Sequence, residues 1–122
     1  MNMLHTLPEW QKKLGLSDWT IELRHVALEG EEANIVKGDT QKWARITIDL
    51  ACPTSLYEYT LVHELLHLVL RNTEWYMMHD RDTDTMEGAH KRLEIDINVL
   101  AKALTGAEWY PWHRDDEIKK RV

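Results

Sequence analysis

Three residues near the middle of the chain, His63, Glu64 and His67, have the types and the spacing of a metal site that activates water. The segment His63-Glu64-Leu65-Leu66-His67 fits the pattern H-E-x-x-H, in which residues four apart lie on the same face of a helix. The two imidazoles can therefore bind one ion. Zinc suits such ligands, because it binds imidazole nitrogen at about 2.0–2.1 Å and leaves one position of its tetrahedron to water. Glu64 is placed beside the pair, where its carboxylate can reach that water as a general base.

The helix that carries this motif is expected to be buried on nearly all sides. Ser55 and Glu58 have the spacing of a capping box, which predicts a helix from Ser55 to about Arg71. Its circumference is mostly apolar, through Leu61, Val62, Leu65, Leu66, Leu68, Val69 and Leu70. The remaining polar sector consists of Thr60, His63, Glu64, His67 and Arg71. Burying two imidazoles and a carboxylate without partners is costly, so a metal is the simplest explanation; the alternative is that they are hydrogen-bonded on an ordinary helix.

This helix, together with two other segments, resembles the short zincin metallopeptidase domains of phage and bacterial genomes, of the gluzincin type. The resemblance covers roughly half of the chain, in Ala44–Leu50, Thr60–Leu70 and Glu94–Ala101. It implies a minimal zincin-like α+β fold, in which a small, mostly antiparallel sheet packs on the active-site helix and on a second long helix. It also implies zinc as cofactor and peptide-bond hydrolysis as the reaction, so that the chain would be an HExxH metallopeptidase.

The resemblance further implies that a glutamate on the later helix is the third metal ligand. Glu94 fits this position, because Ile97, Leu100 and Ala101 follow it in the pattern E-x-x-[apolar]-x-x-L-A. Two alternatives stay open. In a shifted register, Asp96-Ile97-Asn98 resembles the Glu-Ala-Asn of zincin relatives that cleave phage repressors, and Asp96 would then be the ligand. His90 lies one turn before Glu94 and could be a ligand or the hydrogen-bonded partner of one.

The expected substrate is a protein or peptide. In related zincins an edge strand beside the active-site helix pairs with an extended substrate, and the resemblance assigns this role to Ala44–Leu50. Zinc held by two imidazoles and a carboxylate lowers the pKa of its water towards about 7. Glu64 would take the proton of this water and later deliver it to the leaving amine. The residue that stabilises the oxyanion is left open among Tyr76, His79 and His90.

Fold and metal do not establish turnover. The main alternative is therefore a non-catalytic zincin-fold module that binds metal for a regulatory or interaction role. A further alternative is an interaction protein without metal. The presence of Glu64 favours the enzyme, since metal binding alone would need the histidines but not this carboxylate.

The remaining elements are predicted from periodicity and capping. Thr6 and Glu9 have the spacing of a capping box and Gly15 is a stop signal, which together predict a helix over residues 7–14. Alternating apolar and polar residues predict strands, and Gly106 ends a periodic helical pattern. The predicted order continues with strands over 19–26, 35–36 and 44–50, a loop over 72–84, a helix over 84–106 and a tail over 109–122 that packs in part through Trp109 and Trp112.

Length and composition set the outer bounds. The chain has 122 residues, 43% of them hydrophobic, which suffices for one domain over 1–122. Its net charge of −6 disfavours nucleic acid and anionic membranes as partners. The single Cys52 has no internal disulfide partner, and no segment has the pattern of a signal peptide or a membrane span. We therefore expect a cytoplasmic protein, in the host cytoplasm if it is phage-encoded, and the oligomeric state stays open.

Overall fold

The computed structural model describes residues 4–38, 40–79 and 83–107, and of residues 76–79 and 83–87 it describes the backbone. Within these ranges it contains three strands and four helices, so the α+β class is confirmed. The elements follow in the order α1 (Leu7–Lys13), β1 (Thr20–Val26), β2 (Ala33–Lys37), β3 (Trp43–Asp49), α2 (Thr54–Val69), α3 (Arg71–His79) and α4 (Thr83–Thr105). In the described part of the chain, no helix is long and apolar enough to cross a membrane.

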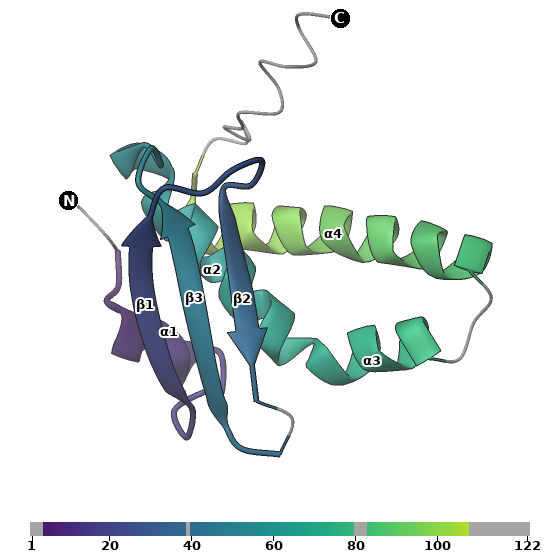
Figure 1. Cartoon of the computed structure of the whole chain (residues 1–122). Helices are drawn as coiled ribbons and strands as arrows, with labels where there is room; N and C mark the ends of the chain where they lie inside the picture. The colour runs from purple at the N-terminus through teal and green to yellow at the C-terminus, as the bar shows by residue number, and fades with distance from the viewer. Residues whose placement is uncertain (1–3, 39, 80–82, 108–122) are drawn as a thin grey trace, which may run out of the picture.

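The sheet is mixed, with the order β1-β3-β2 (Figure 1). The chain crosses from β1 to the far edge and returns through a hairpin, so that β3 fills the gap between the other two strands. As a result β3 pairs antiparallel with β2 but parallel with β1, and Ile46 lies opposite both Leu23 and Ile35. The expectation of a mostly antiparallel sheet is therefore wrong, since the longer pairing is the parallel one.

The strand at 44–50 is correctly predicted, but its expected place at the edge of the sheet is wrong. Both sides of β3 are occupied, by β1 and by β2, so that its backbone groups are used within the sheet. A substrate cannot pair with it. The strand ends at Asp49, and Leu50, which was expected on the apolar face, lies in a turn and is exposed.

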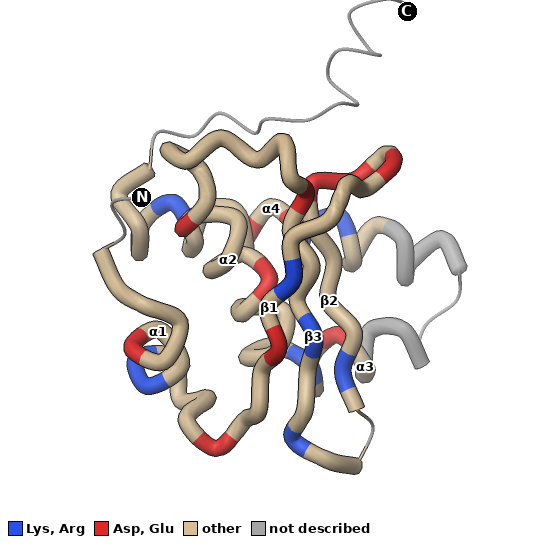
Figure 2. The backbone as a smooth tube through the Cα atoms, turned by 60° about the vertical axis from the view of Figure 1, so that its left-hand side comes forward, with Lys and Arg blue, Asp and Glu red and all other residues tan. Residues whose placement is uncertain are grey.

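The core lies between the sheet and the helices behind it. In Figure 1 the strands lie in front of α1 and α2, and Ala44, Ile46 and Ile48 of β3 are fully buried. α2 and α4 add Leu61, Val62, Leu65, Leu68, Ile97 and Ala101, all of them fully buried. The other face of the sheet carries the alternate residues of β1 and β3, which include Glu22, Arg24 and Arg45; Figure 2 marks the charged positions along these strands. On this face, Arg45 and Glu22 lie in register and form an ion pair of 3.2 Å.

The capping box at Thr6 is confirmed, whereas the one predicted at Ser55 is wrong. α2 begins at Thr54 behind Pro53, without a hydrogen bond from a capping side chain. Glu58 is used elsewhere, because its buried carboxylate accepts hydrogen bonds from the backbone N–H of Leu4 and His5 and from the indole N–H of Trp10. A capping glutamate would have to turn back towards its own helix end, which this position excludes.

A helix stands where most of the loop over 72–84 was predicted. α2 ends at Val69, and the backbone N–H of Glu74 donates a hydrogen bond to the carbonyl of Leu70, so that α3 begins immediately after this residue. The apolar periodicity that reveals a buried helix is weak in this segment, because one of its inward contacts is an ion pair. α4 ends before Gly106, whose φ is 69°, as predicted. The predicted tail, with Trp109 and Trp112, lies outside the described residues.

Candidate metal centre

α2 places its two motif histidines on one side, facing the same point. The ring centroids of His63 and His67 are 5.2 Å apart, as expected for residues one turn apart on a helix. Most of the helix around them is buried, as predicted, and the two imidazoles are among its few side chains that reach the surface. Their side chains are 20% and 14% exposed, which leaves the site open to an ion and to a small part of a substrate.

α4 brings Glu94 to this point from across the core. Its carboxylate oxygens lie 3.2 Å from Nε2 of His63 and 2.8 Å from Nε2 of His67. One donor atom from each of the three residues lies within 4.8 Å of the others. Two ligands of a tetrahedral zinc are roughly 3.3 Å apart, given bonds of about 2.0–2.1 Å. Small rotations of the side chains therefore suffice to place one ion between the three groups.

The two alternative third ligands are not part of this cluster. Asp96 and His90 are exposed, and the group of metal-ligating side chains found among the described residues consists of His63, His67 and Glu94. The helical register explains the difference, because Leu93 and Ile97 are buried and Glu94 borders this buried face. Asp96 projects away from it.

Glu74 is a further member of the site that the sequence did not reveal. It lies on α3 and forms an ion pair with Nδ1 of His67, while Nε2 of the same ring faces Glu94. Metal-bound histidines commonly donate their second N–H to a carboxylate, which fixes the ring and raises its basicity. With residues 72–84 predicted as a loop, no helical register pointed to Glu74. The one available signal was its place seven residues, or about two helical turns, after His67.

Glu64 differs from the other carboxylates of the site because it is almost fully buried and partly unsatisfied. Its exposed fraction is 6%, and Oε2 has no hydrogen-bond partner among the described residues. Burial raises the pKa of Glu64 to about 7, although His63 and His67 act to lower it. A buried acceptor without a partner is costly unless a bound group supplies one. A water or substrate group beside the cluster would meet this requirement.

His63, His67, Glu74 and Glu94 form a network of charged contacts when no metal is bound. Burial acts to lower the pKa of His67, but its contacts with Glu74 and Glu94 raise it to about 10. Burial also acts to lower the pKa of His63, but the hydrogen bond to Glu94 and the charges of Glu64 and Glu94 together raise it. Burial acts to raise the pKa of Glu94, but the two imidazoles hold it well below its usual range. Both imidazoles thus have a greater tendency to carry a proton, and Glu94 to stay ionised, when no metal is bound.

The donor set is of the kind that binds zinc. Two imidazole nitrogens and one carboxylate form a three-ligand site of the type found in catalytic zinc centres, with one position left for water or substrate. The unsatisfied oxygen of Glu64 is consistent with such a position. The residues present therefore fit a zinc ion, and binding it requires the imidazoles to give up their protons.

The group that would stabilise an oxyanion is not identified. The side chains of Tyr76 and His79 lie outside the described residues, and His90 is exposed. Tyr59, one turn before His63, donates a hydrogen bond of 3.0 Å to Asn98 and so ties α2 to α4. This contact gives Tyr59 a structural role beside the metal cluster.

No protein-family model, curated protein or solved structure matches this chain. The likeness to short zincin domains therefore remains a prediction from the motif. What the site can do follows from its geometry, in which a His-His-Glu cluster lies beside a buried glutamate with an unsatisfied oxygen.

Proposed function

We propose that this protein is a zinc-dependent peptidase of the zincin type. The observation that carries the proposal is the convergence of His63, His67 and Glu94 from two helices next to Glu64. Glu64 alone would be an unexplained cost to the fold, because one of its buried oxygens has no partner among the described residues. A metal centre that activates water explains all four residues together.

Zinc, when bound, would lower the pKa of a water molecule and polarise the carbonyl of the scissile bond. The residues of the chain supply the rest. Glu64 is placed to take a proton from the attacking water and to pass it to the leaving amine. Burial of Glu64 favours the protonated form of its carboxylate, which helps it to take up a proton from water. Glu74 keeps Nε2 of His67 directed at the cluster by holding Nδ1.

The proposed substrate path follows one edge of the sheet. Among the described strands, β1 and β2 each have a neighbour on one side only, and β2 is the edge strand that packs against α2, the helix of the two histidines (Figure 1). An extended peptide can add to such an edge through its backbone groups. We therefore assign to residues 33–37 the role that was predicted for 44–50. Backbone pairing of this kind gives affinity for a peptide without distinguishing between sequences. Preference for particular sequences must therefore come from pockets that bind the side chains of the peptide.

A metal-binding module without turnover is the main alternative. It explains the histidines and Glu94 equally well, but it leaves the burial of Glu64 without a purpose. A structural zinc site also has four protein ligands, whereas three are found together here among the described residues. Both features favour the enzyme.

The test is to compare the wild type with Glu64→Gln, both purified without a histidine tag. We expect about one zinc per chain in both proteins by elemental analysis. We expect hydrolysis of a peptide library by the wild type and a rate lower by about 10²–10⁴ in Glu64→Gln, the usual contribution of a general base. Glu29→Gln, which changes an exposed glutamate, is the control and should cleave like the wild type. Equal cleavage by Glu64→Gln would refute the mechanism, and zinc binding without any cleavage by the wild type would favour the module.

A further inference from the structure

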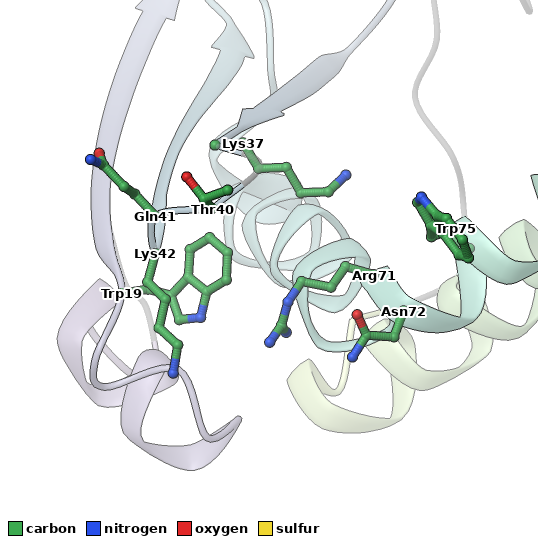
Figure 3. A pocket seen from close by; sticks show the side chains of 10 residues that line it. Trp19, Lys37, Thr40, Gln41, Lys42, Arg71, Asn72 and Trp75 are labelled. Carbon is green, nitrogen blue, oxygen red and sulfur yellow. The ribbon is translucent and has the colours of Figure 1, made fainter.

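A cavity of about 650 Å³ opens next to the metal centre, between the β2–β3 hairpin and the start of α3. We call it the basic pocket, and the residues that line it include Trp19, Lys37, Lys42, Arg71, Glu74 and Trp75. Figure 3 shows Lys37 reaching from the hairpin towards the side where Arg71, Asn72 and Trp75 stand on α3. Asp39, between Gly38 and Thr40, lies outside the described residues.

The described wall of this pocket is positively charged in a protein whose net charge is −6. Of its charged residues, Lys42 is paired with Asp18, and Glu74 is paired with His67. Lys37 and Arg71 remain. Lys37 is exposed and has no ion-pair partner among the described residues. Among the described residues, neither Lys37 nor Arg71 forms an ion pair, although Asp18 is near enough to Arg71 to interact with it electrostatically. Both cations can therefore contribute positive charge to the cavity.

Arg71 is held in a fixed position, as a binding residue requires. Its Nη1 donates a hydrogen bond of 2.8 Å to the carbonyl of Leu68, and its guanidinium lies 5.0 Å from the centre of the Trp19 ring. Stacking of this kind orients the plane of the guanidinium. The N–H groups that Leu68 does not use remain able to bind a planar carboxylate.

Trp75 supplies an apolar wall. The residue is 59% exposed and lines the cavity, so that part of its indole is accessible to a ligand there. An indole beside two cations is suited to a ligand that is apolar along its length and negative at one point. A peptide with a carboxylate has this character, and a cavity of this size accepts more than a single side chain.

The pocket adjoins the proposed substrate path at two points. Lys37 is the last residue of β2, the free edge along which a peptide would pair. Glu74 lines the pocket and also contacts His67 of the metal cluster. A chain lying along β2 past the metal centre would thus place a neighbouring residue in the pocket.

We propose that the basic pocket binds a carboxylate of the peptide substrate through Lys37 and Arg71, so that the protein selects peptides with an acidic group near the scissile bond. This inference rests on the proposed function for its substrate but not for the pocket itself. A phosphate of a nucleic acid is disfavoured, because acidic residues interrupt the basic ones along the chain in Figure 2 and the total charge is negative.

Binding can be measured apart from cleavage. The host is the full chain with Glu64→Gln, with and without zinc, and the probes are fluorescein-labelled, amidated peptides of Ala, Val and Thr with one Glu, Gln or Lys scanned through each position. We expect the best Glu peptide to bind about 5- to 10-fold more tightly than its Gln counterpart, the range for a partly exposed charge-assisted contact. The same neutral peptides with a free C-terminus show whether a terminal carboxylate can replace the side chain.

Charge reversal identifies the pocket as the source of this preference. In Lys37→Glu we expect the Glu preference to vanish or to turn into a preference for Lys, and Lys37→Gln should give an intermediate result. Lys102→Glu, at an exposed position in the last turn of α4, is the matched control and should keep the Glu preference.

Four outcomes decide whether the inference holds. Equal binding of Glu and Gln peptides, or a Glu preference that survives Lys37→Glu, overturns the inference even if the wild type cleaves peptides. Displacement of the Glu peptide by a tighter-binding single-stranded oligonucleotide also overturns it, in favour of a phosphate ligand. A Glu preference that depends on Lys37 supports it, and does so even if the wild type binds no zinc and cleaves nothing, in which case the proposed function alone fails.

Discussion

The carboxylate of Glu94 contacts both motif histidines at Nε2, the nitrogen atom through which each would bind a metal. Nε2 of His63 and Nε2 of His67 face its two oxygens, while Nδ1 of His67 faces Glu74. The contact of Nδ1 with Glu74 leaves Nε2 of His67 available to a metal. The three side chains are therefore already close together, and an ion bound between them would replace the protons of the imidazoles.

Replacing Glu74 should weaken zinc binding without unfolding the protein. In Glu74→Gln the side chain can still accept the N–H of His67, but its negative charge is lost. We expect the zinc affinity to fall by about 10- to 100-fold, the usual effect of removing such an outer partner. Competition with a chromophoric chelator measures it. Asp96→Asn, at the rejected third-ligand position, is the control and should bind like the wild type. An unchanged affinity in Glu74→Gln would show that this carboxylate does not tune the ligand.

The candidate site could be predicted from the sequence only where its residues are close in the chain. His63, Glu64 and His67 are recognisable because one helix sets their geometry, whatever surrounds it. Glu94 depends on how α4 packs against α2, so that a resemblance was needed to choose it over Asp96. Glu74 could not be predicted, since its contact depends on a helix that the local pattern did not show.

Among the elements, strands and helices with a strict apolar period were predicted, and the way they pair was not. β3 alternates apolar and polar residues, and α1 has its capping box, so that both were found close to their true bounds. The place of β3 inside the sheet depends on the crossover from β1 to β2, which has no local signal. The same limit of local patterns applies to Glu58. Its spacing from Ser55 is typical of a helix cap, but its carboxylate contacts a segment that is distant in sequence.

Glu58 should matter for the attachment of α1 to α2. Its carboxylate accepts hydrogen bonds of 3.0, 2.8 and 2.7 Å from Leu4, His5 and Trp10. Glu58→Gln puts an N–H₂ group where donors already converge, so that at least one buried donor loses its acceptor. We expect a loss of about 1–3 kcal/mol in the free energy of unfolding, measured by urea denaturation of the metal-free protein. The exposed change Glu29→Gln should leave it within about 0.5 kcal/mol. A loss no larger than that of the control would mean that the N-terminal segment does not depend on this carboxylate.

At the scale of the whole molecule, the metal centre joins parts of the chain that are far apart in sequence. α2 packs on the sheet and α4 packs on α2, and the ion would be held by residues from both helices. An ion that binds only the folded state adds its binding free energy to the stability of the fold. The metal-free and zinc-bound forms should therefore respond to pH in opposite ways.

For the metal-free protein, the direction in which the free energy of unfolding changes with pH follows from the pKa shifts of His67, Glu64 and Glu94. His67 has its pKa raised from 6.5 to about 10, so its ion pairs contribute fully below about pH 6.5 and are lost as the pH rises towards 10. Glu64 has its pKa raised from 4.5 to about 7 by burial, so that it also costs stability as the pH rises through this range. The lowered pKa of Glu94 acts at the other end, contributing above pH 4.5 and being lost below it.

We therefore expect the free energy of unfolding of the metal-free protein to be greatest near pH 5 and to fall steadily from there to pH 9. With zinc in excess it should instead rise between about pH 6 and pH 8, because the ion binds neutral imidazoles and protons compete with it. Urea denaturation across this range, with chelator or with zinc, measures both slopes. His67→Gln should flatten the metal-free slope above pH 7 and abolish the gain from zinc, whereas His90→Gln, which removes an exposed histidine, should change neither. Parallel slopes in the two forms would show that the imidazoles of α2 do not exchange protons for a metal, and the site would then be an ion-pair network that belongs to the fold alone.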